Sequence, residues 1–222
     1  MSRIENGWYK KLYCKTETVD YGKSQNRYDL LKINAHNIYP HLRLHEDNKY
    51  WEVSQKNVQK NNNCIFLNRA QLKKLAEQID EISNFGLVHG DLCFSNIGFD
   101  REENVLLFDW EINLEIRDKN NLILKTTPYC LHPLDQATNN ITKLTDRFSI
   151  AALTMISCHN PSWRSNLSYN QSLRRRVADY IDSILIFSNI ELVDRILHKI
   201  ERSNSSNGLV ADKVEKSWIL AK

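Results

Sequence analysis

Apolar residues recur with two different periods along this chain of 222 residues, and the first part has the pattern of short strands. Residues 8–15 are rich in aromatic side chains, and residues 42–45 alternate between apolar and polar positions. Glu46-Asp47-Asn48 is a turn signal, so residues 49–53 are predicted to return as the partner strand. Between these strands, Ser24 is the predicted cap of a helix that runs to about Ala35.

After a stretch rich in Asn and Lys at residues 56–63, the apolar period becomes helical. Residues 69–84 have the clearest helical pattern, and Gly86 is the predicted stop. Further helices are predicted from a Thr145 cap to about Ser157, over about 170–187, over about 190–202, and as a short last helix in the final fourteen residues. Strands followed by helices around one short hairpin predict a two-lobe arrangement.

A group of polar residues interrupts the apolar pattern between residues 87 and 110. Leu87-Val88 and residues 105–108 are predicted to be short buried strands, and they frame His89-Gly90-Asp91-Leu92. Asn96 follows five residues after Asp91, and Asp109 follows thirteen residues after Asn96. Each residue alone is typical of a turn, a helix cap or a structural histidine. Together they match the needs of phosphoryl transfer: a carboxylate to accept the hydroxyl proton, and an amide oxygen and a second carboxylate to hold metal.

This pattern resembles the catalytic loop and the metal-binding Asp of the protein-kinase-like superfamily, written H-R-D-L-x-x-x-N and D-F-G in protein kinases. Gly90 stands in place of the Arg, and Trp110-Glu111 stand in place of Phe-Gly. Both replacements resemble those of small-molecule and sugar kinases, including aminoglycoside, choline and lipopolysaccharide-core sugar kinases.

The resemblance extends over about sixty residues. Thr127 to Pro133 resembles the T-P-x-Y-x-x-P that closes the activation segment of protein kinases, with Tyr129 one place early and Leu134 where the family usually has Glu. Asp146 falls where the family has a buried Asp that accepts hydrogen bonds from the catalytic-loop backbone. Read alone, Asp146 is an acid favoured at a helix N-terminus, and Thr127-Pro128 is an ordinary turn.

The resemblance implies an α+β, bilobal protein-kinase-like fold. Its reduced, strand-rich N-lobe with one helix would cover residues 1–55, and residues 56–68 would be a linker. The mostly helical C-lobe, with the catalytic loop and the metal-binding Asp, would cover residues 69–222. It further implies an ATP-dependent and Mg²⁺-dependent phosphotransferase in which Asp91 deprotonates the acceptor hydroxyl, and Asn96 and Asp109 hold the metal.

In the first lobe the family uses a strand Lys to hold the α- and β-phosphates. Lys10 is the expected residue, and Lys11 is the alternative because strand alternation sends their side chains to opposite faces. Asp29 is the only acid on the predicted helix that could pair with it. Gly7 is the only glycine before Gly22, so the G-x-G-x-x-G loop over the phosphates is absent.

Three functions follow as alternatives. A kinase with a protein Ser/Thr acceptor is slightly favoured, because the segment after Asp109 is the part that docks a peptide in the family. A sugar, lipopolysaccharide-core or other small-molecule kinase is the second, and a pseudokinase that acts as a binding module is the third. Arg174-Arg175-Arg176 is interpreted as a solvated helix face, with attraction of an anionic substrate as the alternative.

The composition bears on the partners, the metal sites and the location of the protein. A hydrophobic content of 41%, a charged content of 26% and a net charge of +3 are ordinary for a globular protein and give no reason to expect a nucleic-acid partner. The five cysteines are odd in number, without a C-x-x-C pair, which predicts reduced thiols and no zinc site. No signal region and no membrane-spanning run are found, so we expect a cytoplasmic protein, with signal-less export as the alternative.

Overall fold

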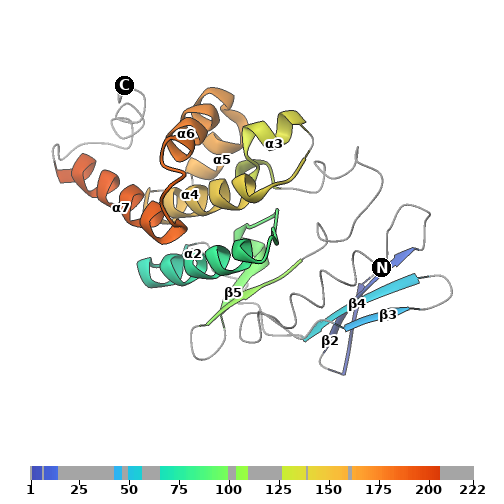
Figure 1. Ribbon diagram of the computed structural model, residues 1–222. Helices are drawn as coiled ribbons and strands as arrows, with labels where there is room; N and C mark the ends of the chain where they lie inside the picture. The colour runs from blue at the N-terminus through green and yellow to red at the C-terminus, as the bar shows by residue number, and fades with distance from the viewer. Residues whose placement is uncertain are drawn as a thin grey trace.

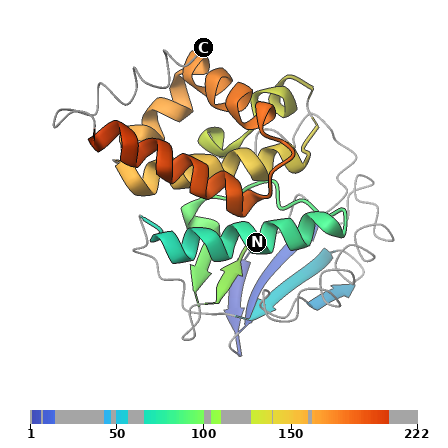
Figure 2. The same ribbon diagram turned by 60° about the vertical axis from the view of Figure 1, so that its left-hand side comes forward.

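Strands come first along the chain and helices follow, in a mixed α+β structure that is mostly helical (Figure 1). The computed structural model describes residues 2–6, 8–14, 43–46, 50–56, 66–99, 104–109, 127–138, 140–159 and 162–205. In both views a four-stranded sheet lies at one end and the helices from α3 onwards at the other, with α2 and a short hairpin between them (Figures 1 and 2).

The four-stranded sheet is antiparallel, in the order β1-β2-β4-β3. Its strands are β1 (Ser2–Glu5), β2 (Trp8–Cys14), β3 (Arg43–Glu46) and β4 (Tyr50–Lys56). Asn6, which follows β1, has a φ of 50°, a left-handed conformation that Asn adopts more readily than most residues. The three predicted strands and the β3–β4 hairpin are confirmed, whereas β1 was not predicted. The predicted helix from Ser24, and residues 57–65 of the predicted linker, lie outside the described residues.

Helix α2 (Arg69–Asn84) has the bounds that the sequence predicts, because both ends are fixed locally. At its start, the Asn68 side chain accepts from the Gln71 N–H, and the Gln71 side chain accepts from the Asn68 N–H. At its end, Gly86 has a φ of 71°, and the N–H groups of Gly86 and Leu87 donate to the carbonyls of Ser83 and Ile82. The chain therefore leaves α2 in a defined direction, toward residues 89–91.

The hairpin is formed by β5 (Ile97–Phe99) and β6 (Val105–Leu107), which pair antiparallel. The short 3-10 turn η1 (Phe94–Asn96) precedes it. The prediction of a strand at Leu87-Val88 is wrong, because these residues are in a loop. The N–H groups just after them, of His89 and Gly90, donate to the Asp146 side chain instead of to a neighbouring strand. The buried strand that partners residues 105–107 is β5.

The rest of the described chain is helical, and α3 and α5 are the elements that the sequence did not predict. The segments are η5 (Pro128–Cys130), α3 (Pro133–Thr138), α4 (Lys143–His159), α5 (Ser162–Tyr169), α6 (Gln171–Ser183) and α7 (Asn189–Ser205). Helices α6 and α7 confirm the two predicted late helices, although α6 ends earlier, at Ser183. The predicted last helix lies outside the described residues.

The predicted Thr145 cap is wrong, because α4 begins at Lys143. The Thr142 hydroxyl oxygen accepts from the Leu144 N–H at 3.2 Å, which is the local contact that a cap makes. The Thr145 hydroxyl instead donates to Asp135 at 2.7 Å. A tertiary partner therefore takes the side chain that the sequence pattern assigned to the helix start.

Helix α4 lies at the centre of the packing. Its Ile150 and Leu153 belong to one buried cluster with α2, the hairpin and α7, and its Phe148 and Met155 belong to a second with η5, α6 and α7. This confirms the prediction that an apolar helix starting near Thr145 is buried on several sides. Within the part of the chain that the structure describes, none of the helices has the length and apolar character needed to cross a bilayer.

Candidate active site

The loop from His89 to Asp91 is held by one buried carboxylate on the first turn of α4. The Asp146 side chain is fully buried, and its Oδ2 and Oδ1 accept from the N–H groups of His89 at 2.7 Å and Gly90 at 2.6 Å. Gly90 has a φ of 80°, which a residue with a Cβ adopts only with strain. The expected place of Asp146, under the loop backbone, is confirmed.

Burial is also the dominant influence on the Asp146 carboxyl. It raises the pKa of Asp146 to about 7, against the two hydrogen bonds from Gly90 and His89, which lower it. The negative charges of Asp135 and Asp91 raise it further. The carboxyl that shapes the loop therefore titrates close to neutral pH.

His89 is a structural residue in this loop. Its ring is fully buried, Nε2–H donates to the Phe108 carbonyl at 2.8 Å, and Nδ1 accepts from the Asp91 N–H at 3.2 Å. These two partners define the neutral tautomer, and burial lowers the pKa of His89 to about 4. His89 thus stays uncharged at neutral pH and ties the loop to the end of β6.

Asp91 and Asn96 are in direct contact. Asn96 is buried at 4% exposure, and its Nδ2 donates to the Asp91 carbonyl at 3.0 Å and to Asp91 Oδ2 at 3.1 Å. Because the amide nitrogen serves Asp91, the amide oxygen is the atom of Asn96 that suits a cation. The sequence predicts a shared site for the two residues, and the direct contact between the Asn96 amide and the Asp91 carboxylate was not predicted.

Asp109 reaches the same group of residues through Phe108. The Phe108 N–H donates to the Asn96 carbonyl at 2.8 Å, and the Phe108 carbonyl accepts from His89. The next residue, Asp109, is half-buried and has a φ of 62°. Asp91 and Asp109 both lie close enough to His89 for their charges to raise its pKa, although burial outweighs them. A left-handed non-glycine residue costs roughly 1 kcal/mol, and such strain is concentrated at functional sites.

Thr127 also contacts Asp91, through a hydrogen bond that the sequence did not predict. Its main-chain N–H donates to Asp91 Oδ1 at 2.7 Å. Thr127 is followed by η5, in which Tyr129 and Cys130 are buried, and the Ser149 hydroxyl of α4 donates to the Cys130 carbonyl at 2.9 Å. The segment predicted to face an acceptor is thus fixed beside the predicted base.

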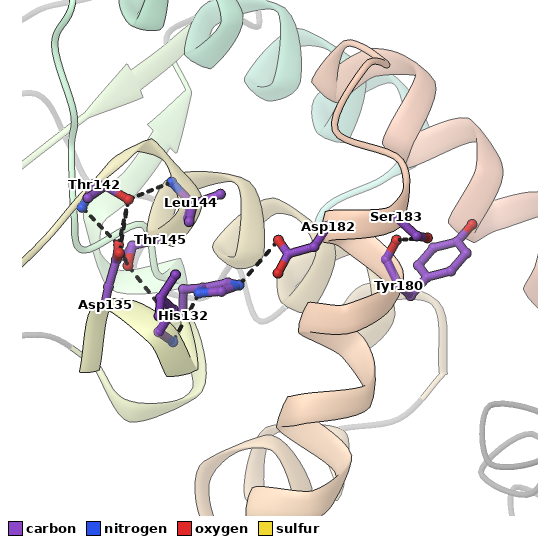
Figure 3. Close-up of polar contacts among 9 residues, drawn as sticks. His132, Asp135, Thr142, Leu144, Thr145, Tyr180, Asp182 and Ser183 are labelled. Atoms are coloured by element: carbon purple, nitrogen blue, oxygen red, sulfur yellow. Dashed lines mark hydrogen bonds and ion pairs between the residues drawn. The ribbon is translucent and has the colours of Figure 1, made fainter. Parts of the chain in front are cut away.

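Asp135 is a second buried carboxylate that the sequence did not reveal (Figure 3). It accepts from the Thr142 N–H at 2.8 Å, from the Thr142 hydroxyl and from the Thr145 hydroxyl. It joins α3 to the start of α4, whereas its neighbour Leu134, at the place where the family usually has Glu, is 53% exposed. The signal available in the sequence was an acid, Asp135, one residue after the position where the family usually has Glu.

The interpretation of the arginine run as a solvated face is wrong for its first residue. Arg174 is buried at 5% exposure, and its guanidinium donates to the Leu131 carbonyl at 2.5 Å. Arg175 is exposed and Arg176 is half-buried. Arg174 therefore anchors the chain after η5, and its spacing of three, four and seven residues from the buried Val177, Ala178 and Ile181 was the signal in the sequence.

Lys10 lies on β2, in the four-stranded sheet. Its side chain is 23% exposed, and Nζ pairs with Glu5 Oε2 at 2.9 Å. Glu5 is on β1, two positions along the same face, so the pair is a diagonal cross-strand contact. Glu5 was not predicted as a partner of Lys10. The predicted partner, Asp29, lies outside the described residues, as does the side chain of Lys11.

Asn96 and Asp109 carry oxygen atoms of the kind that hard cations such as Mg²⁺ prefer. Within the described ranges, no three His, Cys, Asp or Glu side chains form a group able to hold a metal. Mg²⁺ usually needs fewer protein ligands than such a cage, because it keeps waters and takes phosphate oxygens. Asn96 and Asp109 provide an amide and a carboxylate oxygen of this kind.

Neither a protein-family model nor a curated protein matches this chain.

Proposed function

We propose that this chain is an ATP-dependent and Mg²⁺-dependent phosphotransferase of the protein-kinase-like superfamily, which transfers the terminal phosphate to a hydroxyl group. The observation that carries the proposal is the Asp91–Asn96 contact on a loop whose backbone is held by the buried Asp146. Asp109 follows directly after the residue that bonds both Asn96 and His89. Three oxygen-bearing side chains are thereby supplied by one loop and one hairpin.

Asp91 acts as the base in this proposal. Its carboxylate orients the acceptor hydroxyl and accepts its proton as the oxygen attacks the terminal phosphorus and the bond to the departing ADP oxygen breaks. Asn96 and Asp109 would hold Mg²⁺, which neutralises the phosphate charge when bound. Lys10, kept in place by Glu5, would contact the α- and β-phosphates.

The proposal includes the two-lobe kinase-like fold, with the four-stranded sheet as a reduced N-lobe. It is supported by the antiparallel sheet with Lys10 on β2, and by the helical part centred on α4. The sequence contains no G-x-G-x-x-G motif, so the proposal assigns no glycine-rich loop to the nucleotide. The acceptor that we favour is a protein Ser or Thr, because the segment starting at Thr127 lies against the base.

A sugar or other small-molecule hydroxyl is the second candidate acceptor. Gly90 after His89, and Trp110-Glu111 after Asp109, support it by their resemblance to small-molecule kinases. The missing glycine-rich loop supports a pseudokinase as the third possibility, whereas the retention of Asp91, Asn96 and Asp109 argues for turnover.

The test combines nucleotide binding with transfer. Thermal unfolding is measured with ATP, with Mg²⁺ and with both, and transfer from γ-labelled ATP is then followed with the chain itself, a mixed protein substrate and a sugar panel as acceptors. We expect Mg²⁺-dependent stabilisation by ATP and labelling of the protein substrate that Asp91→Asn abolishes. Labelling of a sugar alone selects the second candidate, stabilisation without any transfer selects the pseudokinase, and no stabilisation overturns the assignment.

A further inference from the structure

The Asp91 carboxylate is held from both sides by groups of the protein. Asn96 Nδ2 donates to Oδ2 at 3.1 Å, and the Thr127 N–H donates to Oδ1 at 2.7 Å across a separation of 36 residues. A carboxylate has about two acceptor positions on each oxygen. Each oxygen of Asp91 therefore carries one protein donor and keeps one position for an incoming hydroxyl.

The two donors differ in origin. Asn96 belongs to the same loop as Asp91, whereas Thr127 follows Asp109 by eighteen residues in the sequence. The chain after Thr127 is firmly anchored, since the Cys130 N–H donates to the Thr127 carbonyl at 2.9 Å and Cys130 itself is fully buried. The Thr127 N–H is thus presented to Asp91 from the edge of a fixed turn.

We propose that the main-chain N–H of Thr127 is a positioning group for Asp91, which makes the base competent only while the chain at Thr127 is docked on it. The inference rests on the proposed function, because it assigns to that site a second donor that fixes the rotamer of the base. With Asn96 as the only donor, the carboxylate can rotate about its terminal torsion, which is broad for Asp. Docking of the segment that faces the acceptor and alignment of the base become one event.

The conformation of Thr127 allows a test with two variants, of which one keeps this N–H and the other lacks it. Its φ is −65° and its ψ is 122°, which are values that proline adopts, and Pro128 already restricts this position to extended conformations. Thr127→Pro therefore deletes the donor at a φ and ψ that proline itself adopts. Thr127→Ala is the matched variant: both variants lose the hydroxyl, which lowers the pKa of the Cys93 thiol against the effect of burial, but only Thr127→Ala keeps the N–H.

The kinetic arm compares these two variants. We expect kcat of Thr127→Pro to be lower than that of Thr127→Ala by about tenfold or more, with equal affinity for Mg²⁺ and ATP, because a misplaced base slows transfer without affecting nucleotide contacts. A merely structural role of the contact would change the melting temperature and nucleotide affinity together. Equal kcat values for the two folded variants would overturn the proposal.

The second arm needs no catalysis and no change at residue 127. Hydrogen exchange of the Thr127 amide is followed by NMR in the wild-type chain and in Asp91→Ala, with Asp109→Ala as the control that leaves Asp91 in place. We expect Asp91→Ala to speed this exchange by about tenfold or more, and Asp109→Ala to leave it slow. Equal exchange in all three proteins would overturn the proposal. A wild-type chain that transfers no phosphate overturns the proposed function instead, and the exchange result then decides by itself whether Thr127 holds Asp91.

Discussion

Asp146 Oδ1 accepts a hydrogen bond from the Gly90 N–H at 2.6 Å, so the buried start of α4 sets the shape of the loop that carries Asp91. The other oxygen of the carboxylate accepts from the His89 N–H at 2.7 Å. Directly after these two N–H groups, the chain turns at Gly90, whose φ of 80° is left-handed. Helix α4 and the loop from His89 to Asp91 therefore form one hydrogen-bonded unit.

Asp146→Asn should disable this unit. An Asn side chain offers one oxygen and one NH₂ group, so one of the two loop N–H groups would face a donor instead of an acceptor. We expect transfer activity to fall by about a hundredfold, the scale of a displaced catalytic group, while the chain stays folded. The measurement is kcat at saturating ATP, with Asp179→Asn as the control because Asp179 is exposed on α6. Full activity of Asp146→Asn would contradict the role assigned to Asp146.

The same carboxyl and His89 should have opposite effects on stability as a function of pH. The folded-state pKa of Asp146, about 7, lies above its ordinary value of 3.8, so its contribution to stability is lost as pH rises from about 4 to 7. The folded-state pKa of His89, about 4, lies below 6.5, so its contribution is present above 6.5 and is lost as pH falls toward 4. Between these limits the folded chain carries on Asp146 the proton that the unfolded chain carries on His89.

The two effects on stability should therefore nearly cancel in the wild-type chain. A variant that lacks one of the two groups should show the pH dependence that the other group causes. In Asp146→Asn, we expect the melting temperature relative to wild type to rise as pH increases from 4.5 to 7. His89→Gln should show the reverse trend over the same range. Thermal unfolding followed by circular dichroism across this range measures both, and parallel curves for all three proteins would show that these groups do not titrate as their burial requires.

The sequence predicted best those features that neighbouring residues determine. The bounds of α2 follow from Asn68, Gln71 and Gly86, which form both caps through contacts within a few residues. The Asp91–Asn96 contact is also local, because five residues separate the two side chains, but the spacing predicted only a shared site and not this contact. Asp146 was placed by its spacing and by resemblance, and its contacts with the loop confirm that expectation.

Apart from the contacts of Asp146, which the resemblance indicated, features that depend on a distant partner were not predicted. Thr145 fits a helix cap until Asp135 takes its hydroxyl. The spacing of Arg174 places it on the apolar face of α6, but the Leu131 carbonyl that it binds carries no signal in the sequence. The Thr127 contact uses a main-chain N–H, which carries no signal in the residue type. Such partners become visible only when the packing of α4 against its neighbours is known.

Gly98→Ala should displace the hairpin that carries Asp109. A Cβ at Gly98 would lie 2.8 Å from Phe108 Cε2, and the Phe108 ring is only 2% exposed, so it has little room to move. We expect a loss of about 1–3 kcal/mol in unfolding free energy, as for other overpacked cores, together with weaker Mg²⁺-dependent nucleotide binding. Denaturant unfolding and binding titration measure the two effects.

Gly86→Ala is the control for that variant. Its φ of 71° imposes strain of about 1 kcal/mol on an Ala, but a Cβ there meets nothing within 4 Å. It should therefore lower stability and leave nucleotide affinity at the wild-type value. Equal losses of affinity in both variants would mean that general destabilisation, and not the Phe108 contact, weakens binding.

Asn189→Ala should weaken the junction of α4 with α7. Arg147 is buried at 8% exposure, and one guanidinium nitrogen donates to Asn189 Oδ1 at 3.0 Å while the other donates to the Ile184 carbonyl at 2.8 Å. Removing the amide leaves a buried charged donor unsatisfied, which costs about 1–3 kcal/mol. Denaturant unfolding measures the loss, and Asn140→Ala is the control because Asn140 is exposed. A stability equal to that of Asn140→Ala would mean that Arg147 finds another partner.

Asp109→Ala and Asp91→Ala should separate binding from turnover. Asp109 is a proposed metal ligand, so its loss should abolish the Mg²⁺-dependent part of nucleotide binding. Asp91 is the proposed base, so its loss should leave that binding intact and lower kcat by about a hundredfold or more. Calorimetric titration with ATP, with and without Mg²⁺, gives the first quantity, and transfer of labelled phosphate gives the second. Because Asp91 also accepts from Asn96 and Thr127, both variants are compared at matched fractions of folded protein. If the two substitutions changed affinity and rate to the same extent, the carboxylates would share one role, and the division between metal ligand and base would have to be abandoned.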